Sequence, residues 1–276
     1  MGPEDVHPSC SPLFPHIFFK NQFRSKPTCP SIGTSFAGKV AIVTGTNQGL
    51  KLETADQLLS IGLSRLIISV RSIAKGEAAA NTLRAKYPQA TINVFQLDMS
   101  SYSSIQVSIV YIEKLDSADL VILNVGVRKT KFELCPNTGH EETIQVNYIS
   151  TALLYILLPP LSIIGCGLAF LSRKLSPVAP ALMALRKNVA ARSMRIGAST
   201  YVDAAVLKGK KSHGSYIMSW KISPFVRLLY TADGKQITEN LWQETMAELS
   251  FADVQGILDS LLRRLLVLAN ILKSRA

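Results

Sequence analysis

The sequence contains eight tyrosines, and none of them is followed by a lysine four residues later. Side chains at this spacing share one face of a helix, where a lysine can prepare a tyrosine to donate a proton. Tyr216 and Tyr230 have a lysine five residues later, but both lie in strand-like or turn-like sequence. The sequence therefore lacks a helical tyrosine–lysine pair for general acid catalysis.

Metal-ligand spacing, internal repeats and a signal peptide are also missing from the sequence. The cysteines, at 10, 29, 135 and 166, show neither metal-binding spacing nor a disulfide framework, which favours a reducing compartment. Residues 1–36 are rich in Pro, Ser and Lys and have no continuous apolar stretch. We expect a cytoplasmic protein with no bound metal and an irregular N-terminal arm.

Acidic residues are few, with 19 Asp and Glu against 30 Lys and Arg, so the formal net charge is +11. The basic residues are scattered and form no recognisable nucleic-acid-binding module. We therefore expect a solvated basic surface and no nucleic-acid partner. Attraction to an anionic cofactor or to a membrane surface is the alternative.

Two apolar stretches bear on membrane contact. Thr151–Phe170 has no charged residue over a length that could cross a bilayer, but Pro159 and Pro160 interrupt it. Ile257–Leu272 places leucines over a wide helical face that charged residues interrupt. This second stretch predicts an amphipathic helix that packs on its own domain, or else contacts a partner or a membrane surface.

Residues 39–62 carry the most informative pattern of the chain. Val40–Val43 is a short β-branched run, typical of a strand that is buried on both faces. Gly45 permits a tight turn, Gly49 lets the backbone approach phosphate oxygens, and the N–H groups of the following helix supply donors. The pattern predicts a phosphate over Gly45–Leu50, although two glycines alone also suit an ordinary turn.

Residues 44–50, Thr-Gly-Thr-Asn-Gln-Gly-Leu, resemble the Thr-Gly-x-x-x-Gly-Ile/Leu-Gly turn of the short-chain dehydrogenase/reductase superfamily. The likeness is to fungal members, namely retinol-dehydrogenase-like and secondary-metabolism reductases. Lys51 replaces the third glycine, which normally permits close packing of helix on sheet. We expect the lysine to push the helix outward or to swing its stem toward solvent. The alternative places its ammonium beside the phosphates.

The resemblance continues in the second strand, Leu66–Val70. Arg71 follows this strand at the position where a cation marks NADP and an acid marks NAD. Lys75 lies one helical turn later, with no acid between the two. The resemblance therefore implies NADP as the cofactor, with both cations near its 2′-phosphate.

A third strand is predicted at Thr91–Leu97 and is followed by Asp98. Asp98 resembles the residue that meets the adenine in this superfamily. It is also a candidate cap for a helix over Ser100–Lys114. Both roles can coexist.

Leu120–Leu123 predicts a fourth buried strand that ends in Asn124-Val125-Gly126, similar to the Asn-Ala-Gly that lines the adenine-ribose side of the cofactor. Residues 139–148 resemble the long helix whose asparagine, here Asn147, supports a proton-relay water. By resemblance, the cofactor-binding residues are Gly45, Asn47, Gly49, Leu50, Arg71, Lys75, Asp98, Asn124 and Gly126.

The active-site half departs from the family pattern. Leu161–Gly167 resembles the fifth strand, whose end should present a serine to the substrate carbonyl, but Cys166 stands there and a thiol is a weaker donor. The helix with Tyr-x-x-x-Lys and the sixth strand are not recognisable after residue 174, whereas familiar sequence returns at 192–197 and 212–216. These features indicate an internal deletion near residues 172–180.

We therefore predict a single Rossmann-like α/β domain over residues 37–250, with a doubly wound parallel sheet that lacks one helix and one strand. The arm 1–36 precedes it and an amphipathic helix over 251–276 follows it. The resemblance implies an NADP-dependent oxidoreductase that transfers hydride to or from a small-molecule carbonyl or alcohol in fungal secondary metabolism. The alternative is a catalytically inactive cofactor-binding or interaction protein, or the product of an incomplete gene model. An uncovered fifth strand favours a homo-oligomer.

Overall fold

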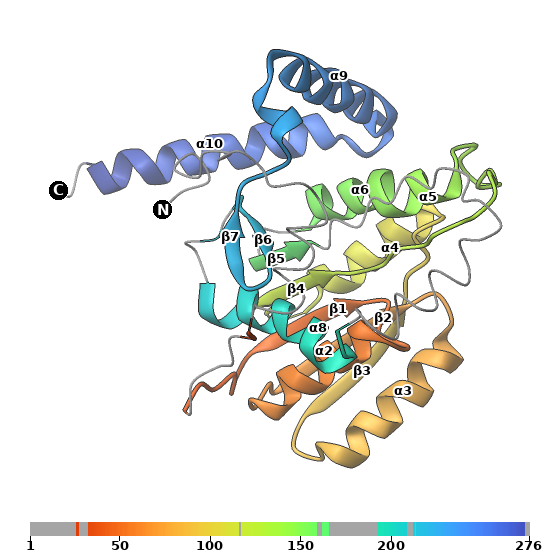
Figure 1. The fold of residues 1–276 in the computed structure, drawn as a ribbon, viewed down its shortest axis with the longest axis vertical. Helices are drawn as coiled ribbons and strands as arrows, with labels where there is room; N and C mark the ends of the chain where they lie inside the picture. The colour runs from red at the N-terminus through yellow and green to blue at the C-terminus, as the bar shows by residue number, and fades with distance from the viewer. Residues whose placement is uncertain are drawn as a thin grey trace.

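The computed structural model describes residues 26–27, 33–115, 117–158, 162–165, 192–208, 212 and 214–273. The core of the fold is a parallel sheet with the strand order β3-β2-β1-β4-β5 (Figure 1). Its strands are β1 (Val40–Thr44), β2 (Arg65–Val70), β3 (Thr91–Gln96), β4 (Leu120–Leu123) and β5 (Ser162–Gly165). The predicted strands are confirmed to within two residues at each end.

The strand order reverses between β1 and β4, because β1 pairs in parallel with both β2 and β4. In open α/β sheets a crevice forms beyond the carboxyl ends of the strands at such a switch point. The glycine turn follows β1 directly, so the topology places it at this crevice.

Residues of β1 alternate between two apolar cores, one on each face of the sheet. Val40 and Ile42 pack into the first core, whereas Ala41 and Val43 pack into the second. The first core is completed by α4 (Tyr102–Glu113) and α6 (Ser150–Leu157), and the second by α2 (Leu50–Ser60), α3 (Ile73–Lys86) and α8 (Met194–Val202). Helices on both faces explain why the strands are apolar at successive positions, and they confirm the Rossmann-like α/β fold.

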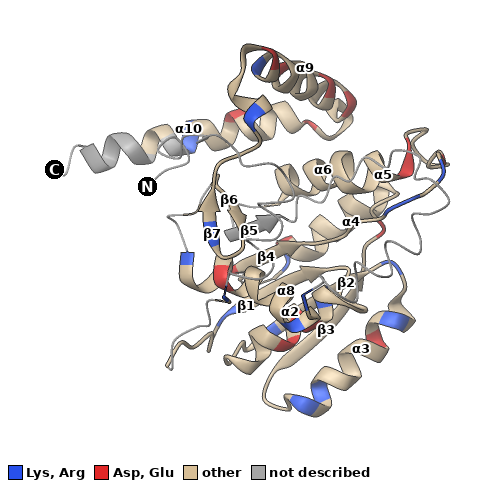
Figure 2. Ribbon diagram, in the orientation of Figure 1, with Lys and Arg blue, Asp and Glu red and all other residues tan. Residues whose placement is uncertain are grey.

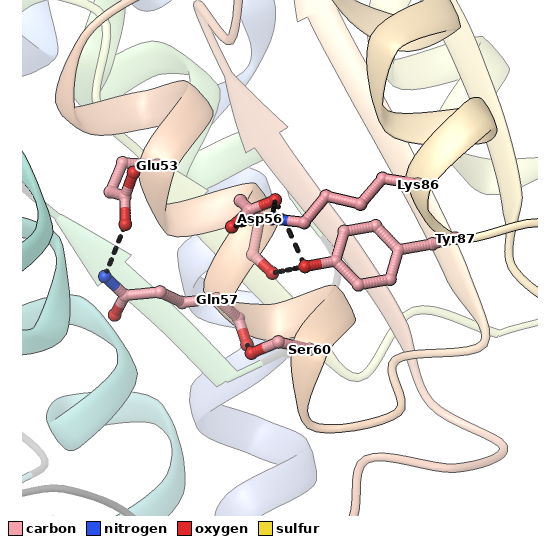
Figure 3. A network of polar contacts seen from close by, with 6 residues as sticks. All are labelled: Glu53, Asp56, Gln57, Ser60, Lys86 and Tyr87. Carbon is pink, nitrogen blue, oxygen red and sulfur yellow. Dashed lines mark hydrogen bonds and ion pairs between the residues drawn. The ribbon is translucent and has the colours of Figure 1, made fainter.

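A polar network fastens α3 to α2 (Figure 3). Lys86 Nζ lies 2.6 Å from Oδ1 and 2.8 Å from Oδ2 of Asp56, and the Tyr87 hydroxyl donates to Asp56 Oδ1 at 3.1 Å. Hydrogen bonding to Asp56 raises the pKa of Lys86, and burial raises that of Tyr87. The network thus joins the C-terminal end of α3 to the second half of α2.

The chain beyond α8 builds no further strand of the main sheet among the described residues. After the π-helix η3 (Asp203–Lys208), β6 (Tyr216–Met218) and β7 (Lys221–Ser223) pair only with each other, in antiparallel fashion. β5 is thus the last strand of the main sheet in the part of the chain that the structure describes. Residues 166–191 lie outside the described residues, so the predicted loss of a strand stays a prediction.

The C-terminal part is helical and lies along one end of the molecule (Figure 1). Its elements are η5 (Arg227–Tyr230), α9 (Ala232–Glu248), η6 (Ser250–Ala252) and α10 (Val254–Lys273). Val254 is buried in the first core and Ile257 packs against it, so the predicted packing of this helix on its own domain is confirmed for its first turns. Leu262 and Leu266 are exposed. Contact of this face with a partner or membrane surface stays a prediction.

Glu248, at the end of α9, anchors these helices to the body of the domain. It accepts a hydrogen bond from the Tyr102 hydroxyl at 2.8 Å and lies 2.8 Å from His140 Nε2. Burial raises the pKa of Glu248, but the hydrogen bonds from His140 and Tyr102 outweigh it, so the pKa is lowered. Burial and the contact with Glu248 raise the pKa of Tyr102 to about 12.

Among the longer helices, α4 and α6 carry no basic residue, whereas α3 carries them at both of its ends (Figure 2). In the part of the chain that the structure describes, no helix combines the length and the apolarity that a membrane span requires.

Candidate dinucleotide-binding site

The turn after β1 is held by its own backbone. Gly45 has φ +74°, and its N–H donates to the Ser69 carbonyl at the end of β2 at 2.6 Å. The buried Thr46 hydroxyl donates to the Val43 carbonyl at 2.8 Å, and the Asn47 N–H donates to the Gly45 carbonyl at 2.9 Å. A positive φ costs glycine less than residues with a Cβ atom, so Gly45 has the conformational role that the sequence predicts.

Thr44 joins β1 to β4 at the floor of the crevice. Its side chain is 2% exposed, and its hydroxyl donates to the Ile122 carbonyl at 3.2 Å while it accepts from the Asn124 N–H at 2.9 Å. One hydroxyl thus fixes where the Asn124 backbone leaves β4. The predicted phosphate-binding and adenine-ribose segments are thereby held next to each other.

Gly49 opens onto empty space at the start of α2. It has φ +68°, and a methyl group placed on it would meet no atom within 4 Å. Gly49 is the N-cap of α2 and supplies no side-chain hydrogen bond, so no side-chain cap occupies the N–H groups of the first turn. Leu50 is the first helical residue and is half-buried. The geometry fits an anionic group above the helix end.

Lys51 folds back over the turn. A methyl group placed on Gly45 would lie 2.9 Å from Lys51 Nζ, 3.2 Å from Lys51 Cδ and 3.2 Å from Cγ2 of Val125. The lysine is half-buried, and the expectation that its stem swings to solvent is wrong. Ala55 and Leu58 of α2 are fully buried, so the helix packs on the sheet despite the lysine.

An open pocket of about 440 Å³ lies beside the turn, toward α3. It is lined by Asn47, Gln48, Leu52, Lys75, Ala78, Ala79 and Thr82. The structure therefore brings Lys75 together with Asn47, two of the predicted cofactor-binding residues. Arg71 follows β2 and is exposed, and it is not among the residues that line this pocket.

Asp98 stabilises a turn and does not cap the next helix. Its Oδ1 accepts from the N–H of Ser100 at 2.9 Å and from the hydroxyl of Ser100 at 2.7 Å. The helix α4 begins at Tyr102, and the Ser101 hydroxyl caps it by accepting from the Ser104 N–H at 3.3 Å. The predicted cap at Asp98 is therefore wrong, because a serine at the N-cap position already supplies the acceptor.

Asn124 follows the carboxyl end of β4, and only one of its two polar side-chain atoms has a hydrogen-bond partner among the described residues. It is 7% exposed, and its Oδ1 accepts from the Tyr201 hydroxyl at 3.1 Å. Its Nδ2 is buried without a hydrogen-bond partner among the described residues. A buried amide donor of this kind calls for a partner, and a bound ligand is one explanation. Gly126 lies two residues further on and is exposed.

Asn147 holds the segment after β4. Its Oδ1 accepts from the Val127 N–H at 2.8 Å, and its Nδ2 donates to the Val127 carbonyl at 2.9 Å. Asn147 lies in the π-helical turn η2 (Gln145–Ile149), between α5 (Glu142–Ile144) and α6. Its side chain thus positions the Val127 backbone; the predicted relay water stays a prediction.

Two contributions come from α8, which sequence reasoning did not assign to the site. Tyr201 reaches Asn124, as described above, and Gly197 packs against Leu50, where an added methyl group would lie 2.6 Å from Leu50 Cδ2. In the sequence, only the likeness of residues 192–197 to the family pattern pointed to this segment. The contacts themselves join residues far apart in the chain, so a local pattern does not predict them. Cys166 and the predicted deletion near 172–180 lie outside the described residues.

Comparisons with known proteins identify the family of the chain. Residues 39–161 match the family described as short chain dehydrogenase. The short chain dehydrogenase/reductase mfmJ of Annulohypoxylon moriforme is 42% identical, over 94% of this chain and 98% of the relative. The chain belongs to the short-chain dehydrogenase/reductase family.

One further relative belongs to the same family, and one solved structure shares the fold. The short chain dehydrogenase virL of Hypocrea virens is 36% identical over 89% of this chain and 95% of the relative. A crystal structure of an uncharacterized protein from Mycobacterium paratuberculosis has a TM-score of 0.54 and 22% identity, over 78% of this chain and 95% of that one. At this identity the likeness shows the shared fold alone.

The alignment with mfmJ also shows that this chain is shorter. It runs over 337 positions, whereas the chain has 276 residues, so the relative contains residues that have no counterpart here.

Proposed function

We propose that this short-chain dehydrogenase/reductase binds NADP(H) at the β1–α2 turn and acts as an oxidoreductase on a carbonyl or alcohol of a small molecule. The observation that carries the proposal is the open space over Gly49 at the start of α2, together with the pocket toward α3 that contains Lys75. Its fungal relatives suggest that the substrate belongs to secondary metabolism.

The residues of the turn have distinct roles in this proposal. The N–H groups at the start of α2, reached over Gly49, bind the pyrophosphate. Lys75 and Asn47 face the adenosine side, where Lys75, helped by Arg71, supplies the positive charge for the 2′-phosphate. When bound, the nicotinamide would supply or accept the hydride.

A second candidate is a cofactor-binding protein with little or no turnover. It is favoured because no tyrosine has a lysine four residues later anywhere in the sequence. General acid catalysis is typically worth about 10²–10⁴ in rate, so loss of the proton donor would leave only slow hydride transfer. The longer alignment of the relative agrees with a missing segment, whether deleted in the gene or omitted from the gene model.

Titration of NADPH and NADH against the purified chain, followed by cofactor fluorescence, tests cofactor binding. NADPH should bind more tightly, and Arg71→Asp or Lys75→Met should reduce this preference. Equal affinity for the two cofactors in the parent chain would exclude the proposed 2′-phosphate site.

Turnover separates the two candidate functions. NADPH oxidation by the purified chain with a panel of aldehydes and ketones should be barely detectable, and brisk oxidation would reveal a substitute acid. Sequencing the transcript across the codons for residues 171–182 would distinguish a real deletion from an incomplete gene model.

A further inference from the structure

We propose that Lys51 is a cofactor-binding residue whose ammonium contacts the pyrophosphate of the dinucleotide. The inference rests on the proposed function and adds a binding residue at the position where the family pattern has glycine. At this position, a charged residue that contacts the ligand would thus take the place of a glycine that serves helix packing.

The position of the lysine is the first observation. A methyl group on Gly45 would lie 2.9 Å from its Nζ, so the ammonium lies over the first glycine of the turn. Gly49, the second glycine, borders space that is free to 4 Å around an added methyl group. The ammonium and the opening therefore lie on the same short turn.

The buried amide of Asn124 is the second observation, and it is independent of the helix end. Asn124 is 7% exposed and its Nδ2 has no hydrogen-bond partner among the described residues. Its N–H bonds to Thr44, the residue just before Gly45. This bond holds Asn124 beside the turn that the Lys51 ammonium covers, and an anionic ligand with several oxygens would accept hydrogen bonds from both side chains.

The direction of the side chain selects the pyrophosphate over the 2′-phosphate. Lys51 leans toward Val125 beyond β4, because both side chains approach the same point above Gly45. The pocket with Lys75 and Asn47 lies toward α3, and Lys51 does not line it. The two lysines therefore serve different anionic groups. Since NADPH and NADH share the pyrophosphate, Lys51 should affect both equally.

The experiment measures the affinity of the full-length chain for NADPH and for NADH by fluorescence titration. Lys51→Met keeps the length of the side chain and removes the charge, Lys51→Arg keeps the charge, and Lys51→Gly restores the family residue. Lys114→Met is the matched control, since Lys114 is exposed at the end of α4, shortly before β4 begins, whereas the glycine turn follows the carboxyl end of the parallel strand β1. Thermal unfolding without cofactor checks that each variant is folded.

Lys51→Met should weaken both cofactors by about tenfold or more, the loss expected for one charge-assisted hydrogen bond. The NADPH-to-NADH ratio should stay unchanged, Lys51→Arg should keep most of the affinity, and Lys114→Met should bind like the parent. Equal or tighter binding by folded Lys51→Met or Lys51→Gly would overturn the role of Lys51 and leave the proposed function intact. A parent chain that binds neither cofactor would overturn both.

Discussion

Replacing Thr44 with valine should lower the free energy of unfolding of the domain, because Thr44 joins β1 to β4 where the strand order reverses. Valine has nearly the same shape, so no cavity forms, but the bridge between the Ile122 carbonyl and the Asn124 N–H is lost. Both residues are nine-tenths or more buried, so water cannot easily replace the hydroxyl. Leaving buried polar groups unpaired costs about 1–3 kcal/mol.

A loss of about 2 kcal/mol should lower Tm by about 4–8 °C in a domain of this size. Differential scanning calorimetry of the parent and Thr44→Val would measure it, with Thr44→Ser retaining the hydroxyl. Thr238→Val is the matched control, because Thr238 is exposed on α9 and its hydroxyl bonds only within that helix. An unchanged Tm for Thr44→Val would refute the reasoning that this hydroxyl holds β1 and β4 together.

Three further outcomes are expected. Gly197→Ala should force Leu50 into another rotamer, which should lower the free energy of unfolding by about 1 kcal/mol and weaken NADPH binding. Unchanged NADPH affinity in a titration would show that the contact between α8 and Leu50 does not shape the site. Glu248→Gln should lower Tm at neutral pH. Because the folded-state pKa of Glu248 is depressed, the difference from the parent should begin to shrink below the ordinary pKa of 4.5 and vanish only as the pH falls through the lower folded-state pKa. A pH-independent difference would instead assign the effect to packing. Deleting residues 255–276 should reduce solubility, since the first turns of α10 cover the core, and a soluble monomer with a sharp thermal transition would contradict this.

Much of the cofactor half could be predicted from local sequence. Val40–Val43 and Leu120–Leu123 are uniformly apolar because both of their faces are covered, and that requirement is visible in four consecutive residues. The roles of Gly45 and Gly49 were also predictable, because glycine has no Cβ atom and therefore tolerates the positive φ that this turn requires. Comparison with relatives then confirmed the family that these motifs indicated.

The sequence by itself therefore determined the order of the elements, the turn and the type of fold. The tertiary structure alone decided where the long side chains go: Lys51 over Gly45 instead of into solvent, and Tyr201 across to Asn124, 77 residues away in the chain. The physical reason is that strand and helix patterns reflect local backbone preference and burial, whereas the direction of a flexible side chain depends on which surfaces the folded elements bring next to it.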